Sequence, residues 1–274
     1  MYSLNGGGRL CSLATPRVMG ILNITPDSFY AGSREQGQKA LIQRAAAMIE
    51  AGATIIDIGA QSTRPDSSYL SAEAEWDRLA PVLPALCRAF PETIFSIDTF
   101  HAVVAQRAVE VGVAMVNDVS GGLLDNNMLS TVGALRVPYV CMHMRGTPQN
   151  MQSHTQYNDL VLEICDYFIE RMAACRAAGI YDIVLDPGFG FAKTIEQNFA
   201  LLGKLAQFQF LGYPLLLGVS RKSSISKTLG VSADDALNGT TVLNTVGLLH
   251  GAHILRVHDV KEAMEAIRLV EKLK

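Results

Sequence analysis

Eight short apolar runs recur along the 274 residues of this chain, and each stops at a polar residue that can take part in chemistry. Successive runs stand roughly 20 to 45 residues apart, the length that one strand, one helix and two loops occupy in a β/α repeat. The residues at which the runs stop are Asn23, Asp57, Asp98, Asn117, His143, Asp186, Ser220 and His258. Eight such units predict a single α/β domain, a closed (β/α)8 TIM barrel.

The apolar runs are continuous stretches of Ile, Val, Leu and Met, as parallel strands covered on both faces require. Between them lie segments with helical periodicity, at 39–51, 72–89, 102–111, 159–178, 195–206, 233–250 and 260–273. We assign residues 18–274 to the barrel and residues 1–17 to an N-terminal extension that covers the barrel floor. An open, doubly wound sheet is the alternative architecture, because a strand count from sequence is uncertain by one or two.

Composition limits the classes of partner. A net charge of -3 and a pI near 6.1 give no general electrostatic reason to bind nucleic acid or an anionic membrane surface. The five cysteines are widely spaced and include no C-x-x-C pair, which is typical of buried thiols in a reducing compartment. The first 16 residues hold no continuous apolar core of a signal peptide, and no later stretch is long enough to span a bilayer. We expect a cytoplasmic protein that binds small molecules.

In parallel α/β folds, the loops at the carboxyl ends of the strands meet on one face, where active sites are built. Any single stop could be structural, since Asp98 could cap a helix and Asp186 could begin a turn. The common phase of all eight stops favours a functional face.

This face is predicted to carry two kinds of chemistry. Arg221 and Lys222 on one segment, and Arg256 and His258 on another, bring basic side chains to neighbouring ends of the barrel, which favours an anion site. Solvated surface charge is the alternative interpretation for Arg221. Asp98, Asn117 and Asp186 offer hydrogen-bond acceptors that suit a flat heterocycle rich in N–H donors. A divalent metal held by the two carboxylates is the competing interpretation, and the lack of adjacent histidines argues against zinc.

Two long segments, 25–38 and 61–71, are rich in glycine, proline and small polar residues. Loops of this length in a compact domain are commonly functional. We interpret both as lids over the anion site.

Eight colinear segments resemble dihydropteroate synthases: MGILNITPDSF at 19–29, DIGAQSTRP at 57–65, SIDT at 96–99, NDVSG at 117–121, MHMRGTP at 142–148, LDPGFGF at 185–191, GVSRK at 218–222 and RVHDV at 256–260. The resemblance implies an enzyme of folate biosynthesis, a transferase that joins 6-hydroxymethyl-7,8-dihydropterin diphosphate to 4-aminobenzoate and releases diphosphate. It also implies a magnesium cofactor, sensitivity to sulfonamides and a homodimer.

Residue roles follow from the same resemblance. The catalytic set is Asp98, Lys222 and Asn23. The implied pterin contacts are Asp98, Asn117, Asp186, Lys222 and Met142, and the diphosphate contacts are Asn23, Thr63, Arg256 and His258, with Asn23 also the metal ligand. The residues implied near 4-aminobenzoate are Ser62, Thr63, Arg64, Phe191 and Ser220.

An aromatic amine is a poor nucleophile, so the family mechanism in which diphosphate leaves first, forming a pterin-stabilised carbocation, fits these residues. Gln61 stands where the family usually has Glu, Asp66 where Gly is common, and Ala236 where Arg is usual. The first two bear on the second loop and the third on subunit contacts. A pterin-dependent methyltransferase domain and a non-catalytic pterin-binding paralogue are the alternative functions.

Overall fold

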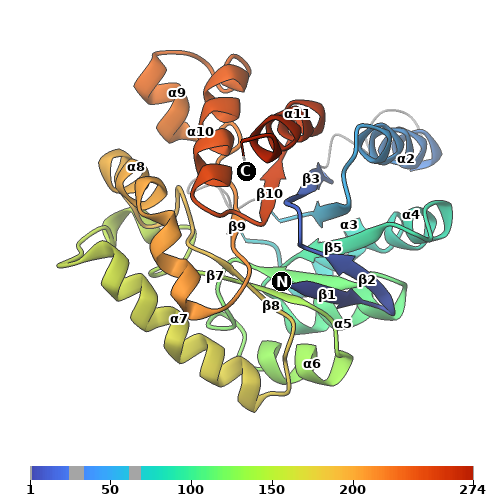
Figure 1. The fold of residues 1–274 in the computed structure, drawn as a ribbon. Coiled ribbons are helices and arrows are strands. Elements are labelled where there is room, and N and C mark those ends of the chain that lie inside the picture. Colours follow the sequence, from blue (N-terminus) through green and yellow to red (C-terminus); the bar gives the residue numbers. More distant parts are fainter. Residues whose placement is uncertain (1, 25–33, 62–68, 274) are drawn as a thin grey trace.

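Eight parallel strands form the centre of the molecule in a computed structural model that describes residues 2–24, 34–61 and 69–273 (Figure 1). Each strand is an apolar run whose residues are almost all buried, because helices cover it outside and other strands face it inside. The strands are β3 (Arg17–Asn23), β4 (Ile55–Gly59), β5 (Ile94–Asp98), β6 (Met115–Asp118), β7 (Tyr139–Met142), β8 (Ile183–Asp186), β9 (Leu216–Leu217) and β10 (Ile254–Val257).

The order of the strands in the sheet is β8-β7-β6-β5-β4-β3-β10-β9, so the last strand of the chain lies beside the first barrel strand. The ring closes between β8 and β9 through the bridge from Leu185 to Leu215, where the Leu185 N–H donates to the Pro214 carbonyl at 2.9 Å. We call this contact the β8–β9 seam. The predicted barrel is confirmed, and the alternative of an open sheet is wrong.

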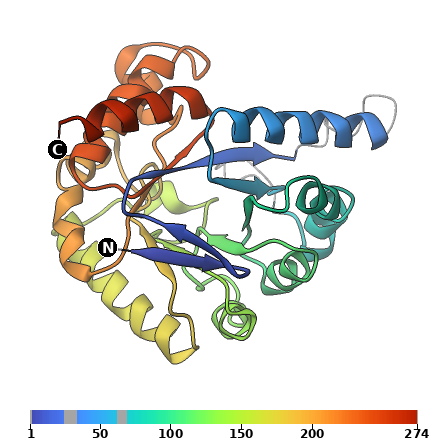
Figure 2. The same ribbon diagram turned by 45° about the vertical axis from the view of Figure 1, so that its right-hand side comes forward.

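Helices surround the strands on the outside of the barrel (Figure 2). They are α2 (Arg34–Glu50), α3 (Ala72–Leu79), α4 (Leu83–Ala89), α5 (Ala102–Glu110), α6 (Met128–Leu135), α7 (Leu160–Ala177), α8 (Ile195–Gly203), α9 (Ser223–Leu229), α10 (Leu237–Leu249) and α11 (Val260–Glu271), with 3₁₀ turns at Met151–Ser153 and Leu205–Leu211. Within the described ranges, each helix is too short or too polar to cross a membrane.

The structure corrects several predicted helix boundaries. The segment 72–89 is two helices, because Pro81 and Pro84 interrupt the backbone hydrogen bonds of one continuous helix. Helix α2 begins at Arg34, so residues 34–38, predicted as part of the first long loop, are helical, while residues 25–33 lie outside the described residues. Helices α6 and α9 were not predicted, since each spans only eight or seven residues and begins without a side-chain cap.

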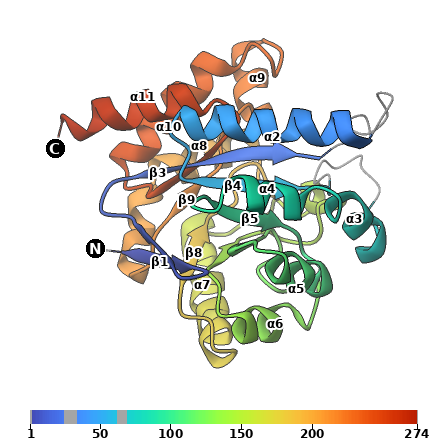
Figure 3. The ribbon, with the colours of Figure 1, turned by 90° about the vertical axis from the view of Figure 1, so that its right-hand side faces the viewer.

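An apolar layer fills the lower half of the barrel. One residue from the start of each strand contributes to it: Met19, Ile55, Ile94, Met115, Val140, Val184, Leu216 and Ile254. A hairpin of β1 (Ser3–Gly6) and β2 (Arg9–Ser12) packs Leu4 and Cys11 against the same cluster. Figure 3 shows this hairpin at the left, where the barrel strands begin. Burying so many large side chains makes the floor a main source of stability, at about 1.5–3 kcal/mol for each.

Candidate active site at the carboxyl ends of the strands

A polar layer lies directly above the apolar one. Side chains two residues apart on a strand point to the same face, so residues two positions after the floor residues also point into the barrel. Five of them are polar or charged: Asp57, Ser96, Asn117, Asp186 and Arg256. Asp57 is fully buried and Asn117 is only 4% exposed. Because buried polar groups are costly unless paired, their arrangement indicates a binding site.

Arg256 joins two carboxylates across the barrel interior. Its Nε donates to Asp57 Oδ2 at 2.7 Å and its Nη2 to Asp98 Oδ2 at 2.6 Å. Although burial opposes it, Asp57 and Asp98 raise the pKa of Arg256 above its ordinary value. Burial raises the pKa of Asp98 to about 7, although Arg256 pulls it down. The site therefore holds one fixed cation between two acids, one of which titrates near neutrality.

Asn117 completes this network from the neighbouring strand. Its Nδ2 donates to Asp57 Oδ2 at 2.9 Å. Two buried oxygens, Asp57 Oδ1 and Ser96 Oγ, have no hydrogen-bond partner among the described residues. Unsatisfied acceptors inside the barrel favour a ligand that brings its own N–H donors.

A turn after β8 holds the second cation. The Asp186 Oδ1 atom accepts from the Gly188 N–H at 2.8 Å. Lys222, just before α9, donates to the Phe189 carbonyl, and its Nζ lies 4.7 Å from the centroid of the Phe191 ring. Burial lowers the pKa of Lys222 to about 8, although the negative charge of Asp186 raises it. Burial also raises the pKa of Asp186, and Lys222 opposes this.

Ser220 and His258 lie together at the ends of neighbouring strands. The Ser220 Oγ atom is 3.0 Å from His258 Nδ1 and accepts from the His258 backbone N–H at 3.1 Å. The His258 ring reaches solvent, yet partial burial lowers its pKa, and Arg256 adds to the effect. Arg221 points elsewhere and forms an ion pair with Asp259, with contacts of 2.8 and 2.9 Å. Of this basic pair, only Lys222 reaches the site.

The remaining predicted residues fall into three groups. Met142 is buried in an apolar cluster with Phe100 and Met144, against which Phe191 packs, so it forms an apolar wall beside the polar layer. Asn23 is exposed at the end of β3, where it pairs in register with Gly59. Ser62, Thr63 and Arg64, with most of both predicted lids, lie outside the described residues.

Two of the departures from the family pattern can be located. Gln61 accepts from the Leu70 N–H at 3.0 Å, so it joins the two described ends of the second loop. Ala236 is fully buried at the residue before α10, and its carbonyl accepts from Thr240. The side chain at 236 is therefore in the interior in this fold. Asp66 lies outside the described residues.

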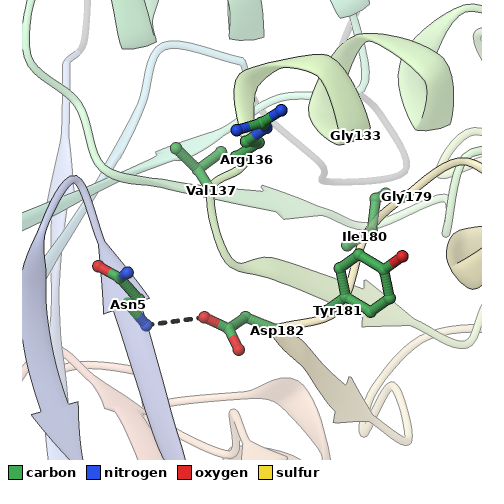
Figure 4. Close-up of a pocket in the computed structure, with 8 residues that line it drawn as sticks. All are labelled: Asn5, Gly133, Arg136, Val137, Gly179, Ile180, Tyr181 and Asp182. Carbon is green, nitrogen blue, oxygen red and sulfur yellow. Dashed lines mark hydrogen bonds between the residues drawn. The ribbon is translucent and has the colours of Figure 1, made fainter.

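A cavity of about 380 Å³ lies at the opposite end of the barrel (Figure 4). Its lining includes Asn5 of the hairpin, Arg136, Tyr181 and Asp182, and the Asn5 N–H donates to Asp182 Oδ2 at 2.8 Å. Asp182 directly precedes β8, so this cavity is separated from the polar layer by the apolar floor. It contains none of the predicted site residues.

Two features of the site were not anticipated from the sequence. Asp57 ends the second apolar run, yet no role was assigned to it, and it proves to be the common partner of Arg256 and Asn117. Arg256, assigned to the anion site, contacts Asp98 of the acceptor set directly, so the two predicted sets of residues meet at this pair. The strands β5 and β10 are not neighbours in the sheet, so these side chains meet in the barrel interior.

Comparison with known proteins agrees with this geometry. The sequence pattern of the family described as "Pterin binding enzyme" matches residues 19–258, from the start of the barrel to His258. The match covers every barrel strand at least in part, so the fold and site define a pterin-binding enzyme.

The dihydropteroate synthase of Escherichia coli (strain K12) is 42% identical over 266 residues, which cover 96% of this chain and 94% of that protein. A crystal structure of Yersinia pestis dihydropteroate synthase with a sulfonamide drug has a TM-score of 0.92 and 38% identity, covering 99% of this chain and 98% of that one. The structure of Xanthomonas albilineans dihydropteroate synthase with 4-aminobenzoic acid has a TM-score of 0.91 and 36% identity, and the match covers 99% of this chain and 97% of that one. This chain belongs to the dihydropteroate synthase family, a family of transferases, as its eight motifs predicted.

Proposed function

We propose that this enzyme condenses 6-hydroxymethyl-7,8-dihydropterin diphosphate with 4-aminobenzoate, forming 7,8-dihydropteroate and diphosphate in folate biosynthesis. The observation that supports it most directly is the buried polar layer, in which Asn117, Asp186 and the unsatisfied atoms of Asp57 and Ser96 face the barrel interior. A pterin ring presents a flat edge of N–H donors and ring acceptors, which is the complement of such a surface. Met142 adds an apolar wall for one ring face.

In the first step, the bond between the pterin methylene carbon and the diphosphate oxygen breaks, and the electron pair leaves with diphosphate. Positive charge then develops on the methylene carbon and the ring. A carboxylate about 4 Å from that charge contributes about 4 kcal/mol at an effective dielectric near 20, or about a thousandfold in rate. Asp98 is the candidate, because it ends β5 directly above the polar layer.

In the second step, the amine nitrogen of 4-aminobenzoate bonds to the methylene carbon and then loses a proton. Phe191, stacked beside the Lys222 ammonium, offers an aromatic surface for the incoming ring, and Ser220 lies at the neighbouring strand end. For the departing diphosphate, Arg256 supplies positive charge and His258 supplies a hydrogen-bond donor. Arg256 also contacts Asp98, so the same side chain binds the departing diphosphate and the carboxylate that faces the developing pterin cation.

We propose magnesium as the cofactor, with the side-chain oxygen of Asn23 as its protein ligand. Among the described residues, no group of three or more His, Cys, Asp or Glu side chains is placed to hold a metal. An exposed amide oxygen at a strand end fits an ion that takes its other ligands from substrate phosphates and water, as magnesium commonly does. When bound, the ion stabilises the negative charge of the leaving diphosphate.

We further propose a cytoplasmic homodimer that binds neither nucleic acid nor membrane. All five cysteines are free thiols, four of them buried, which fits a reducing compartment. Size-exclusion chromatography with light scattering tests the assembly: a mass near twice 29.6 kDa is expected, and a mass near 29.6 kDa contradicts it.

The decisive experiment mixes the purified protein with both substrates and Mg²⁺ and follows dihydropteroate and diphosphate together. Both products in equal amounts are expected. Binding of free pterin without product would instead identify a non-catalytic paralogue. Methyl transfer in place of condensation would identify a pterin-dependent methyltransferase.

A further inference from the structure

A second lysine lies on the inner side of the turn after β8. Lys193 is only 3% exposed. Its ammonium donates to the carbonyls of Gly188 and Phe191, both at 3.0 Å, and lies 3.1 Å from Nδ1 of His143. An ammonium has three protons and no lone pair, and here it meets three acceptors. The group is therefore fully satisfied in a place where an unpaired charge would be very costly.

The state of His143 follows from this contact. Burial lowers the pKa of His143 well below its ordinary value, and Lys193 and Arg145 lower it further. The ring is therefore neutral, and its Nδ1 accepts the lysine proton while Nε2 carries the hydrogen. His143 also donates its backbone N–H to the Asp186 carbonyl at 2.9 Å, so β7 and β8 are both tied to this point.

The two lysines hold the same short turn through different carbonyls. Lys193 donates to the carbonyls of Gly188 and Phe191, and Lys222 donates to that of Phe189. Gly188 has φ +71°, and a Cβ there would lie 2.0 Å from the His143 carbonyl oxygen. At Gly190, a Cβ would lie 2.8 Å from Lys222 Cδ. The turn is therefore fitted closely between His143 and Lys222.

Lys193 also acts on the acid that begins this turn. Asp186 accepts from the N–H of Gly188, while Lys193 donates to the carbonyl of the same residue. The charges that face Lys193 are Asp186, which favours the ammonium form, and Lys222 and Arg145, which oppose it. Burial lowers the pKa of Lys193 to about 7, so the cation is present below neutrality, where Asp186 is most prone to take up a proton. There the positive charge of Lys193 lowers the pKa of Asp186.

We propose that Lys193 is a positioning residue: its ammonium fixes the turn that carries Phe189 and Phe191 beside Lys222, and it keeps the Asp186 carboxylate ionised for the pterin. This inference rests on the proposed function for the identity of the ligand. It requires no contact between Lys193 and substrate, since the three donors of the Lys193 ammonium are taken by protein acceptors.

The test compares Lys193→Met, which removes the charge and all three donors, with His143→Leu, which removes one acceptor and leaves the charge. Free 6-hydroxymethylpterin is titrated calorimetrically from pH 5.5 to 8.5. For Lys193→Met, we expect the acid limit of binding to move up by about one pH unit, because Asp186 loses a nearby cation, and affinity to fall by up to about 10-fold at the acid end of the range. His143→Leu should weaken binding by a similar factor at every pH, with its acid limit unmoved.

A merely structural role for Lys193 predicts equal losses at every pH in both variants, and that result overturns the proposal. Should Lys193→Met fail to fold, ¹⁵N NMR of the lysine ammonium groups in the wild-type protein at pH 6 provides the second measurement. An ammonium held by three acceptors exchanges its protons far more slowly than surface lysines do; fast exchange at Lys193 contradicts the proposal. If the wild-type protein binds no pterin, the proposed function fails, and the NMR result still decides whether Lys193 fixes the turn.

Discussion

The two ends of the barrel are built on the same strands but differ in what their side chains are for. At the floor, residues such as Met19, Ile55 and Met115 fill space with apolar atoms and are closed over by the β1–β2 hairpin. Two residues further along, the same strands carry Asp57, Asn117, Asp186 and Arg256. The difference teaches that stability and ligand binding depend on different parts of the same strands. The first residues of a strand stabilise the fold, and the last residues bind the ligand.

The largest expected effect lies at the upper end, in Asp98→Asn. Removing the negative charge that faces the developing cation should slow turnover about a thousandfold, corresponding to about 4 kcal/mol. Binding of free pterin and the thermal unfolding midpoint should change little, since Asn can still accept a bond from Arg256. Steady-state turnover, pterin calorimetry and thermal unfolding measure the three quantities. Turnover near the wild-type value would remove Asp98 from the mechanism.

The converse change at the floor is Met19→Ala. Met19 is fully buried in the apolar layer, so truncation leaves a cavity and should lower the free energy of unfolding by about 2–5 kcal/mol. Because the site begins two residues above this layer, kcat at a temperature where the variant stays folded should remain within twofold of wild type. Urea unfolding and initial rates provide the comparison. A large loss of kcat in the fully folded variant would show that the two ends are not independent.

Arg256→Ala tests whether the upper end contains a diphosphate site separate from the pterin contacts. Losing a charged hydrogen-bond donor costs about 1.5–3 kcal/mol, so affinity for the diphosphate-bearing substrate should fall about 10- to 100-fold and affinity for free pterin much less.

The same variant predicts a pH effect at Asp98. Arg256 lowers the pKa of Asp98, so removing it must raise that pKa above about 7 and move the acid limit of turnover upward. Calorimetry with both ligands and a pH–rate profile test these points. Equal losses for the two ligands would contradict a diphosphate site.

The smallest expected effect concerns Glu75, a fully buried acid beside the upper end. Thr99 Oγ1 donates to its Oε2 at 3.0 Å, while its Oε1 has no hydrogen-bond partner in the described structure. Burial raises its pKa to about 8 from an ordinary value of 4.5. The folded protein thus retains a proton that the unfolded chain loses, and Glu75 makes folding less favourable as pH rises from 5 to 8.

Glu75→Gln removes this titration and keeps the acceptor for Thr99. Relative to the wild type, the free energy of unfolding of this variant should rise by on the order of 2 kcal/mol between pH 5 and pH 6.5. Urea unfolding at the two pH values measures the difference. A gap between the two proteins that stays constant with pH would show that Glu75 does not titrate in this range.

The strand ends could be predicted from the sequence because each apolar run of this parallel barrel stops at a polar residue, as at Asp98 and Asp186. The ion pair of Arg256 with Asp98 could not, since it joins residues 158 positions apart on strands that have β4 and β3 between them in the sheet. Lys193 was missed for a related reason. It lies two residues beyond the end of the LDPGFGF motif, and its burial depends on how the turn folds back against His143.

The β8–β9 seam has a consequence for ligand binding. Below, it is held by the bridge between Leu185 and Leu215, and above, by the bond from Lys222 to the Phe189 carbonyl. Asp186 belongs to one side of the seam and Lys222 to the other. Local opening of the ring at this point would therefore separate two sides of the pterin pocket. A bound pterin would contact both sides and oppose this opening, which would slow amide hydrogen exchange at Leu185 and its neighbours.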